Sequence, residues 1–415
     1  MIYLFTTFKV KSKGQIEGGK MIVPKLRFKE FNNNWNNEKI SNAFALSSGS
    51  TPNTKQRFFY TGNINWVSSG ELKRKYIVDT INKVSNIAIE KNNLKIYDIG
   101  TLLIAIYGLE ASGVRGTCSI LNIKATISQA CMALESKNNI SNEFMYYWYQ
   151  KNGQWIGLRI AQGTKQQNLT AELIGNLEVE YPSIDEQEKI VNFLSLLDKK
   201  IELQKQKIEA LKIYKTGVCQ KLFQSIKDDK TTFKMQISKF LKERKIYSEK
   251  GLEYPHVTLS KDGILDKSNR YNRDFLVMSN NKEYKITLLN DLCYNPANLK
   301  FGVICINEYG SAIFSPIYVT LEINPNIMDV SFCKYYFTRI DFINKVRKYE
   351  QGTVYERMSV NVEDFLKHTD VFPCLENQRK IVKILSNLDR KINLQKNTLN
   401  NLNILKKSLL QQMFI

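Results

Sequence analysis

Two long stretches of the chain share one pattern of hydrophobic and polar positions. In both, the apolar positions advance by alternating steps of four and three residues. The first runs through Ile190, Leu194, Leu197, Ile201, Gln204, Ile208, Leu211, Lys215, Val218 and Leu222. The second, 191 positions later, runs through Ile381, Leu385, Leu388, Ile392, Gln395, Leu399, Leu402, Lys406, Leu409 and Met413. Such steps are typical of the a/d seam of a coiled coil, so we predict two long helices that bury each other's apolar stripe.

Both seams carry polar residues in the same layers. Gln204 and Gln395 lie near the middle of each helix, the first of which we expect from about Glu186 to Phe223. A seam glutamine costs stability but can fix register. Parallel pairing would bring Lys215 against Lys406. We therefore predict an antiparallel coiled coil in which Gln204 faces Gln395 and each lysine lies near the first turns of the other helix. Two unrelated amphipathic helices would not explain the shared polar layers.

The repeat continues upstream of each helix at an offset of 189 positions. The matching residues are Tyr146, Tyr147, Gln162, Gly163 and Thr164 with Tyr335, Tyr336, Gln351, Gly352 and Thr353, and Gly113-Val114 with Gly302-Val303. Apolar segments such as GTLLIAIYG (100–108) and SPIYVTLEI (315–323) predict strands. We therefore predict the same order in each half of the chain, namely a mixed α/β region, an aromatic helix, a Q-G-T loop and the long helix.

The predicted fold class is α+β, with two α/β domains of similar fold, each followed by one long helix. The segments are a leader at 1–22, domain 1 at 23–180, the central helix at 181–224, domain 2 at 225–371 and the C-terminal helix at 372–415. SSGSTPNTKQRFFYTGNINWVSSGEL has no clear counterpart after residue 230. The globular parts therefore differ more than the helices do.

The chain is strongly basic. Sixty Lys and Arg against forty Asp and Glu leave a net charge of +20. Such a surplus favours a polyanionic partner through steering and counterion release, although a basic but inert surface would look the same. The seven cysteines are scattered, without C-x-x-C pairs, which fits a reducing cytoplasm.

The start of the chain predicts no export signal. Its short apolar part precedes the charges of MIYLFTTFKVKSKGQIEGGK, and no apolar run reaches the length of a membrane span. Because Met21 follows directly, we expect residues 1–22 to be disordered or not translated.

Motifs of catalysis are incomplete. GQIEGGKM (14–21) has phosphate-loop spacing, but Met21 stands where Ser or Thr would bind magnesium. NPAN (295–298) lacks the second proline and the aromatic residue of an adenine methyltransferase motif. Asp198-Lys199-Lys200 has a nuclease-like D-x-K form but lies on the predicted coiled coil, and only His256 and His368 could supply imidazole. The sequence therefore predicts a binding protein without catalytic or metal-binding residues.

Several motifs resemble one family. They are the doubled P-x-x-x-x-Q-x-K-I-V with L-D-x-K-I, VPKLRFKEF (23–31), SSGSTP (47–52) and GNINWVSSGEL (62–72). Together they resemble the specificity subunit of type I restriction-modification systems over nearly the whole chain after about residue 22.

The resemblance implies a function. Each globular domain would be a target recognition domain that reads one half of a bipartite asymmetric site in double-stranded DNA. The helices would act as a spacer ruler and as docking surfaces for two methyltransferase subunits, joined by restriction/translocase subunits. S-adenosylmethionine, ATP and magnesium would serve those partners, with no cofactor in this chain.

We predict DNA contacts from residue types that suit phosphate and base edges. In domain 1 they are Ser48, Ser50, Thr51, Lys55, Arg57, Tyr107, Arg115, Gln129, Lys165, Gln166 and Gln167. In domain 2 they are Arg270, Asn272, Arg273, Asn295, Lys300, Tyr355 and Arg357. Each could instead be a solvated surface residue or turn former, and Gly49 and Gly163 suit turns.

Two alternatives remain. A self-contained DNA methyltransferase or nuclease of unfamiliar type would need a cofactor pocket. A coiled-coil scaffold without a DNA role would explain the helices but neither the charge nor the divergent domains.

Overall fold

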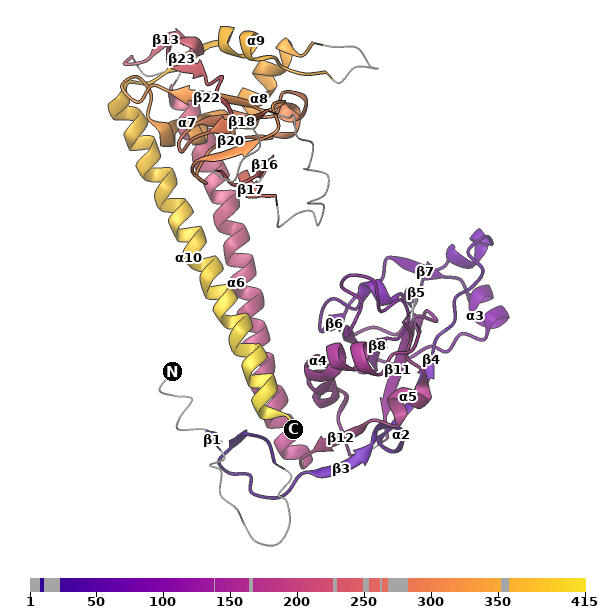
Figure 1. Cartoon of the computed structure of the whole chain (residues 1–415). Helices are drawn as coiled ribbons and strands as arrows, with labels where there is room; N and C mark the ends of the chain where they lie inside the picture. The colour runs from indigo at the N-terminus through magenta and orange to yellow at the C-terminus, as the bar shows by residue number, and fades with distance from the viewer. Residues whose placement is uncertain are drawn as a thin grey trace. The chain divides into compact units, whose positions relative to one another are not determined.

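The computed structural model describes residues 8–10, 23–137, 139–163, 167–226, 230–248, 254–261, 263–267, 283–351 and 358–415. The chain forms two compact units, one of residues 1–206 with 396–415 and the other of residues 207–395. Each unit contains one globular domain and parts of both long helices (Figure 1). Of the predicted leader, only 8–10 are described, and they pair as β1 (Phe8–Val10) with β2 (Leu26–Phe28).

A five-stranded sheet forms the centre of the first domain. Its order is β4 (Phe44–Ser48), β11 (Cys131–Ser136), β8 (Leu102–Ala105), β9 (Cys118–Leu121) and β6 (Tyr76–Ile77). The first four strands are antiparallel neighbours, and β6 is parallel to β9. All four residues of β8 are buried, as the apolar run at 100–108 predicts. The aromatic helix α4 (Asn142–Arg159) packs against β8, β9 and β11.

Smaller elements surround this sheet. A second sheet has the order β10 (Thr126–Ile127), β5 (Ile64–Val67) and β7 (Asn82–Val84), and β3 (Asn36–Lys39) pairs with β12 (Glu178–Tyr181). The helices are α2 (Ile40–Ala43), η1 (Arg57–Tyr60), η2 (Ser69–Glu71), α3 (Asn86–Asn92) and α5 (Ala171–Gly175).

The second domain repeats the central strand order. Its sheet runs β14 (Leu241–Glu243), β22 (Val319–Ile323), β19 (Leu292–Tyr294) and β20 (Ile304–Ile306), all antiparallel. The predicted strand at 315–323 is thus confirmed from Val319 onward. The aromatic helix α7 (Val330–Phe337) packs against β20, as α4 packs against β9. The prediction of two domains with similar folds is confirmed.

The remaining elements of the second domain are small. The paired strands are β13 (Phe233–Gln236) with β23 (Thr369–Phe372), β16 (Val257–Ser260) with β17 (Gly263–Asp266), and β15 (Tyr247–Ser248), β18 (Tyr284–Thr287) and β21 (Ala312–Phe314) in one sheet. The helices are η4 (Ile237–Lys239), η6 (Pro296–Phe301), α8 (Ile340–Val346), η7 (Arg347–Tyr349) and α9 (Val362–Lys367).

The two predicted long helices are α6 (Ile184–Ser225) and α10 (Leu375–Met413). Each follows a proline, which fits the first turn of a helix. In the first unit Asp198 of α6 lies 2.6 Å from Lys406 of α10, and in the second unit Lys215 lies 2.5 Å from Asp389. Early residues of one helix thus meet late residues of the other, which confirms antiparallel pairing. Each lysine meets an aspartate about four turns into its partner, further along than the first turns we predicted.

The far end of each long helix completes a domain core. Leu409, Leu410, Met413 and Phe414 are buried in the core of the first unit, where the Phe414 ring lies 5.0 Å from that of Phe144. Phe223 and Ile226 are buried in the second unit, where the Phe223 ring lies 5.5 Å from that of Phe332.

These contacts correct one sequence match. Gln187 of α6 accepts a hydrogen bond from the backbone N–H of Ser141, and Gln378 of α10 accepts one from Asp329. Ser141 is the N-cap of α4 and Asp329 is the N-cap of α7. The aromatic helices α4 and α7 therefore correspond at an offset of 188 positions. The match of Tyr146 to Tyr335 is wrong by one residue, because a Tyr-Tyr dipeptide aligns almost as well in the neighbouring register.

A second match shifts as well. Gly302 has a positive φ and lies two residues before β20. The glycine two residues before β9 is Gly116, also with positive φ, and not Gly113.

Among the helices that the structure describes, none combines the length and the apolar character that a membrane span requires.

Candidate nucleic-acid interface

Loops at one edge of each central sheet gather most of the predicted contact residues that the structure describes. In the first domain, β4 and β8 end at this edge and β11 and β9 begin there, because the strands are antiparallel. Residues 48–51, 106–117 and 128–130 therefore lie at the same edge. In the second domain, the loop after β19 with Asn295 and Lys300 takes the corresponding place.

The loop after β4 packs against the turn before β11. The backbone N–H of Gln129 donates to the Thr51 hydroxyl at 3.3 Å, and the N–H of Ser50 donates to the Ile127 carbonyl at 3.1 Å. A Cβ on Gly49 would lie 2.0 Å from the Ile127 oxygen. Only glycine allows this approach, which supports the turn role predicted for Gly49.

Four other predicted residues are exposed on this domain. Ser48 ends β4, Lys55 lies just before η1, Arg57 begins η1, and Tyr107 follows β8. Their exposure leaves them accessible to a partner.

Arg115 and Gln167 lie together, although the sequence separates them by 52 positions. The Arg115 guanidinium donates to the Gln167 side-chain oxygen at 2.7 Å, and the Gln167 N–H donates to the Glu110 carboxylate at 2.9 Å. That backbone hydrogen bond lowers the pKa of Glu110. The hydrogen bond between Arg115 and Gln167 thus engages the side chains of two residues that were predicted to contact DNA.

Sequence reasoning missed the residues that hold Arg115. Gln154 of α4 donates to the Arg115 carbonyl at 2.8 Å, and a Cβ on Gly157 would lie 2.5 Å from the Arg115 Cγ. Gly153 similarly faces the backbone of Gly116. The i, i+4 spacing of two glycines on a helix was the available signal, because it indicates a close packing partner.

In the second domain, Asn295 has a local structural role. Its side-chain oxygen accepts from the N–H groups of Ala297 and Asn298, and the residue is 8% exposed. It caps η6, which begins with Pro296. The NPAN sequence is therefore a helix-capping motif. Lys300 is partly exposed, with its ammonium 5.3 Å from the Phe301 ring centre.

The other predicted contact residues lie outside the described residues. They are Lys165, Gln166, Arg270, Asn272, Arg273, Tyr355 and Arg357. The incomplete phosphate loop at 14–21 lies outside them too. Gln204 belongs to the first unit and Gln395 to the second, so their facing each other stays a prediction.

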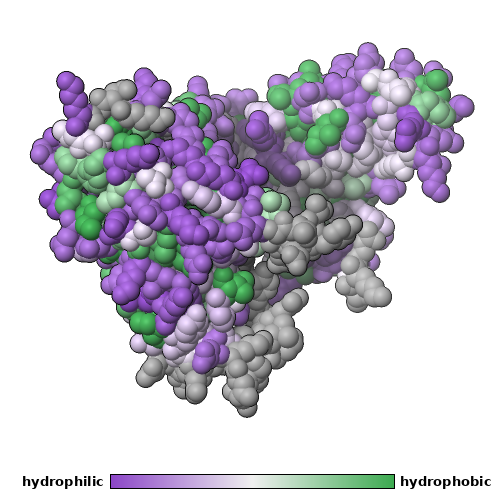
Figure 2. Space-filling view, turned by 90° about the horizontal axis from the view of Figure 1, so that it is seen from above, coloured by the Kyte–Doolittle hydropathy of each residue, from purple (hydrophilic) through white to green (hydrophobic). Residues whose placement is uncertain are grey.

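The face of the molecule seen in Figure 2 is mostly hydrophilic, with separate hydrophobic patches. A hydrophilic surface on a chain of net charge +20 suits an anionic partner.

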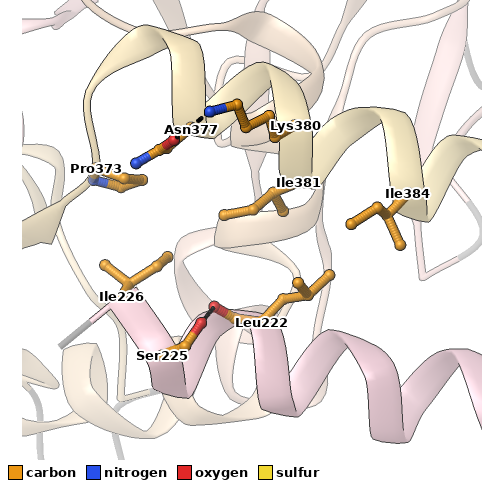
Figure 3. Close-up of a pocket in the computed structure, with 8 residues that line it drawn as sticks. All are labelled: Leu222, Ser225, Ile226, Pro373, Asn377, Lys380, Ile381 and Ile384. Carbon is orange, nitrogen blue, oxygen red and sulfur yellow. Dashed lines mark hydrogen bonds between the residues drawn. The ribbon is translucent and has the colours of Figure 1, made fainter. Parts of the chain in front are cut away.

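A cavity of about 150 Å³ lies in the second unit between the end of α6 and the start of α10 (Figure 3). It is lined by Leu222, Ser225, Ile226, Pro373, Asn377, Lys380, Ile381 and Ile384. Lys380 donates to Asn377 at 3.3 Å, and Ser225 donates to the Leu222 carbonyl at 2.9 Å. The lining is mainly apolar and provides no carboxylate or imidazole for acid–base chemistry. Across the described ranges, no three His, Cys, Asp or Glu side chains are grouped so that they could hold a metal ion.

Residues 32–213 match the family model described as type I restriction modification DNA specificity domain. This stretch of the chain is similar to that specificity domain. The match begins just before β3 and ends inside α6, so it includes the sheet-edge loops of the first domain and over half of the first long helix.

Two relatives match a similar length. The specificity subunit of the type I restriction enzyme MjaIX from Methanocaldococcus jannaschii is 28% identical over 181 residues, 43% of this chain and 41% of the relative. The EcoR124I/EcoR124II specificity subunit from Escherichia coli is 23% identical over 176 residues, 42% of this chain and 43% of the relative. Each match thus spans less than half of the relative's own length.

Solved structures share the fold of nearly the whole chain. The type I restriction-modification S subunit from M. genitalium covers 95% of this chain and 99% of its own, with a TM-score of 0.53 and 18% identity. A chain from a study of complex assembly and conformational transition of the type I R-M system covers 92% and 97%, with a TM-score of 0.55 and 11% identity. The fold shared with these structures therefore includes the second domain and α10.

Proposed function

We propose that this chain is the DNA-binding specificity subunit of a type I restriction-modification complex, and that each domain reads one half of a bipartite site. The main support for this proposal is a comparison of the two domains. The two domains share a central strand order and an aromatic helix, but the loops at the sheet edge differ in sequence and length. Similar frames with different loops suit an asymmetric DNA target, because loops on a rigid scaffold provide specificity.

Charge and surface chemistry support a nucleic-acid partner. The net charge of +20 would draw DNA to the chain, and the exposed Lys55, Arg57 and Tyr107 lie on the loops of the first domain. Arg115 and Gln167 would support these loops rather than contact bases, since they bond to each other.

The long helices would dock two copies of one partner. Three exposed apolar positions recur at the 191-residue offset, namely Leu203 with Leu394, Ile213 with Ile404, and Tyr214 with Leu405. Exposed apolar side chains mark interaction surfaces when they gather. A repeated surface on one chain suits two identical subunits, which we assign as methyltransferase subunits.

Catalysis would belong to the partners. We propose that the chain is not itself an enzyme and acts in the cytoplasm. The methyltransferase subunits would use S-adenosylmethionine, and the restriction/translocase subunits would use ATP and magnesium.

Sequencing of methylated bases tests this function. Cells that carry this gene with its methyltransferase partner should methylate one asymmetric bipartite sequence with a fixed spacer. Methylation unchanged by deletion of this gene would contradict the proposal. Methyl transfer from labelled S-adenosylmethionine by the pure chain would favour the self-contained methyltransferase instead.

A further inference from the structure

In each unit, a tyrosine of the aromatic helix, an aspartate of one long helix and a lysine of the other form a cluster. In the first cluster (Tyr147, Asp198, Lys406), the Tyr147 hydroxyl donates to Asp198 at 2.8 Å, and the Lys406 ammonium lies 2.6 Å from the other carboxylate oxygen. Burial raises the pKa of Tyr147, and the adjacent Asp198 adds to this effect, so the phenol stays protonated and remains a donor.

The second cluster (Tyr335, Asp389, Lys215) has the same geometry. The Tyr335 hydroxyl donates to Asp389 at 2.7 Å, and Lys215 lies 2.5 Å from the other carboxylate oxygen. The aspartates occupy the same position in both copies of the long helix, and so do the lysines.

Each cluster joins three elements. The aspartate comes from one long helix, the lysine from the other, and the tyrosine from the aromatic helix of the domain, α4 or α7. The four charged side chains retain between 17% and 33% of their exposure. At this depth, a lysine without its aspartate would lie on an apolar seam, which is unfavourable. A cluster therefore fixes the position of the helices along each other and the position of the domain on both.

Other helix registers lose these contacts. If α10 slid by one heptad in one direction, Lys406 would face Val191 and Lys215 would face Val382. A slide the other way would place Lys406 against Lys205 and Lys215 against Lys396. The apolar seam alone tolerates such a slide because it repeats every seven residues. The clusters disfavour both alternatives, either by an unpaired charge or by like charges.

We infer that the two Tyr–Asp–Lys clusters set the DNA spacer length by fixing the helix register, and that their members are positioning residues. This inference rests on the proposed function. A slide of one heptad moves a helix by about 10 Å at 1.5 Å per residue, or about three base pairs at 3.4 Å each. The clusters thus exclude spacers that are longer or shorter by about three base pairs.

The second cluster allows a test with a matched control. Asp389→Lys breaks the cluster, and adding Lys215→Asp restores opposite charges. Glu209→Lys changes charge equally on α6 but removes only an exposed pair with Lys212. Methylated sites are sequenced in cells that carry each full-length variant with the methyltransferase partner. We expect Asp389→Lys to raise the ratio of altered to original spacers about tenfold, since specificity is a difference of affinities. The double variant should restore the original spacer, and Glu209→Lys should retain it.

Two results would overturn the inference. One is an unchanged spacer in Asp389→Lys, and the other is a double variant that fails to restore it. If Asp389→Lys does not fold, Tyr335→Phe removes only the donated hydroxyl and should broaden the spacer less. If the wild-type chain directs no bipartite methylation, the proposed function fails. Distances between spin labels at the exposed Ile213 and Leu394 of the second unit would then still decide whether the cluster sets register.

Discussion

Arg27 donates two hydrogen bonds to the carboxylate of Glu186, at 2.8 and 2.7 Å, and both side chains are buried. Arg27 belongs to β2 and Glu186 to the first turn of α6. This bidentate pair attaches the start of the long helix to a strand at the beginning of the first domain. The corresponding position on α10 is Asn377, which donates to Thr231 at 3.1 Å. The two halves therefore anchor their helices by different chemistry.

Arg27→Leu should destabilise the first unit by about 3–5 kcal/mol, because it leaves the buried Glu186 charge unpaired. Replacement of both residues by leucine should cost less than the single change. The Lys189–Glu30 pair is exposed and provides the control, since its loss should cost under about 1 kcal/mol. Denaturant unfolding followed by hydrogen exchange in β2 and α6 measures these effects. Equal costs for the exposed and buried pairs would contradict the prediction.

Asp370 should make the stability of the second domain depend on pH. Burial alone would raise the pKa of this carboxyl, but the adjacent His368, Lys345 and Tyr336 lower it well below its usual range. A lowered folded-state pKa gives stability that is present above the unfolded pKa of about 4 and is lost as pH falls below it. Asp370→Asn should therefore cost about 1 kcal/mol at pH 7, given that Lys345 is partly exposed, and progressively less toward pH 2. A cost independent of pH would show that the charge is not responsible.

DNA affinity of the assembled complex should fall steeply with salt. Each phosphate neutralised contributes a slope of about −0.9 to the plot of log affinity against log salt concentration. Fluorescence anisotropy between 50 and 200 mM salt, about the range in which such binding changes most, measures the slope. A flat plot would contradict a DNA-binding role for the +20 charge.

The domains should act as separate readers. Replacement of residues 24–180 with the matching domain of a relative should change one half of the methylated sequence and leave the other half and the spacer intact. The expectation follows from the separate core in each unit. Sequencing of methylated sites gives the answer, and a change in both halves would contradict it.

The repeated apolar positions should bind the methyltransferase subunits. Leu203→Glu and Leu394→Glu should each remove one subunit from the complex, and the double variant should remove both, as measured by native mass spectrometry. A charge on an apolar contact surface costs binding because the charge loses water there. Leu196→Glu is the control, since Leu196 is also an exposed leucine of α6 but its repeat position is Asn387. Complexes that keep both subunits in the double variant would place the docking surface elsewhere.

Residue patterns along the chain were enough to predict the repeated long helices, their antiparallel pairing and the presence of two similar domains. The helices follow from the periodic spacing of apolar positions, and the antiparallel pairing follows from the need to keep Lys215 away from Lys406. Both can be read from the positions of residues along the chain. Seam residues such as Leu194 and Leu385 are fully buried as the pattern predicts. The motifs at 47–52 and 62–72 lie within the stretch that matches the specificity-domain model.

Which polar groups meet depends on how the elements pack, and residue patterns do not reveal it. The sequence does not indicate that Asp198 contacts Tyr147 and Lys406, because these residues lie 51 positions before it and 208 positions after it. Arg115 and Gln167, both predicted to contact DNA, instead bond to each other across a separation of 52 positions, which the sequence does not indicate either. A hydrogen bond depends on distances within about 3 Å, which the packing of the domain cores sets and which residue type alone does not encode.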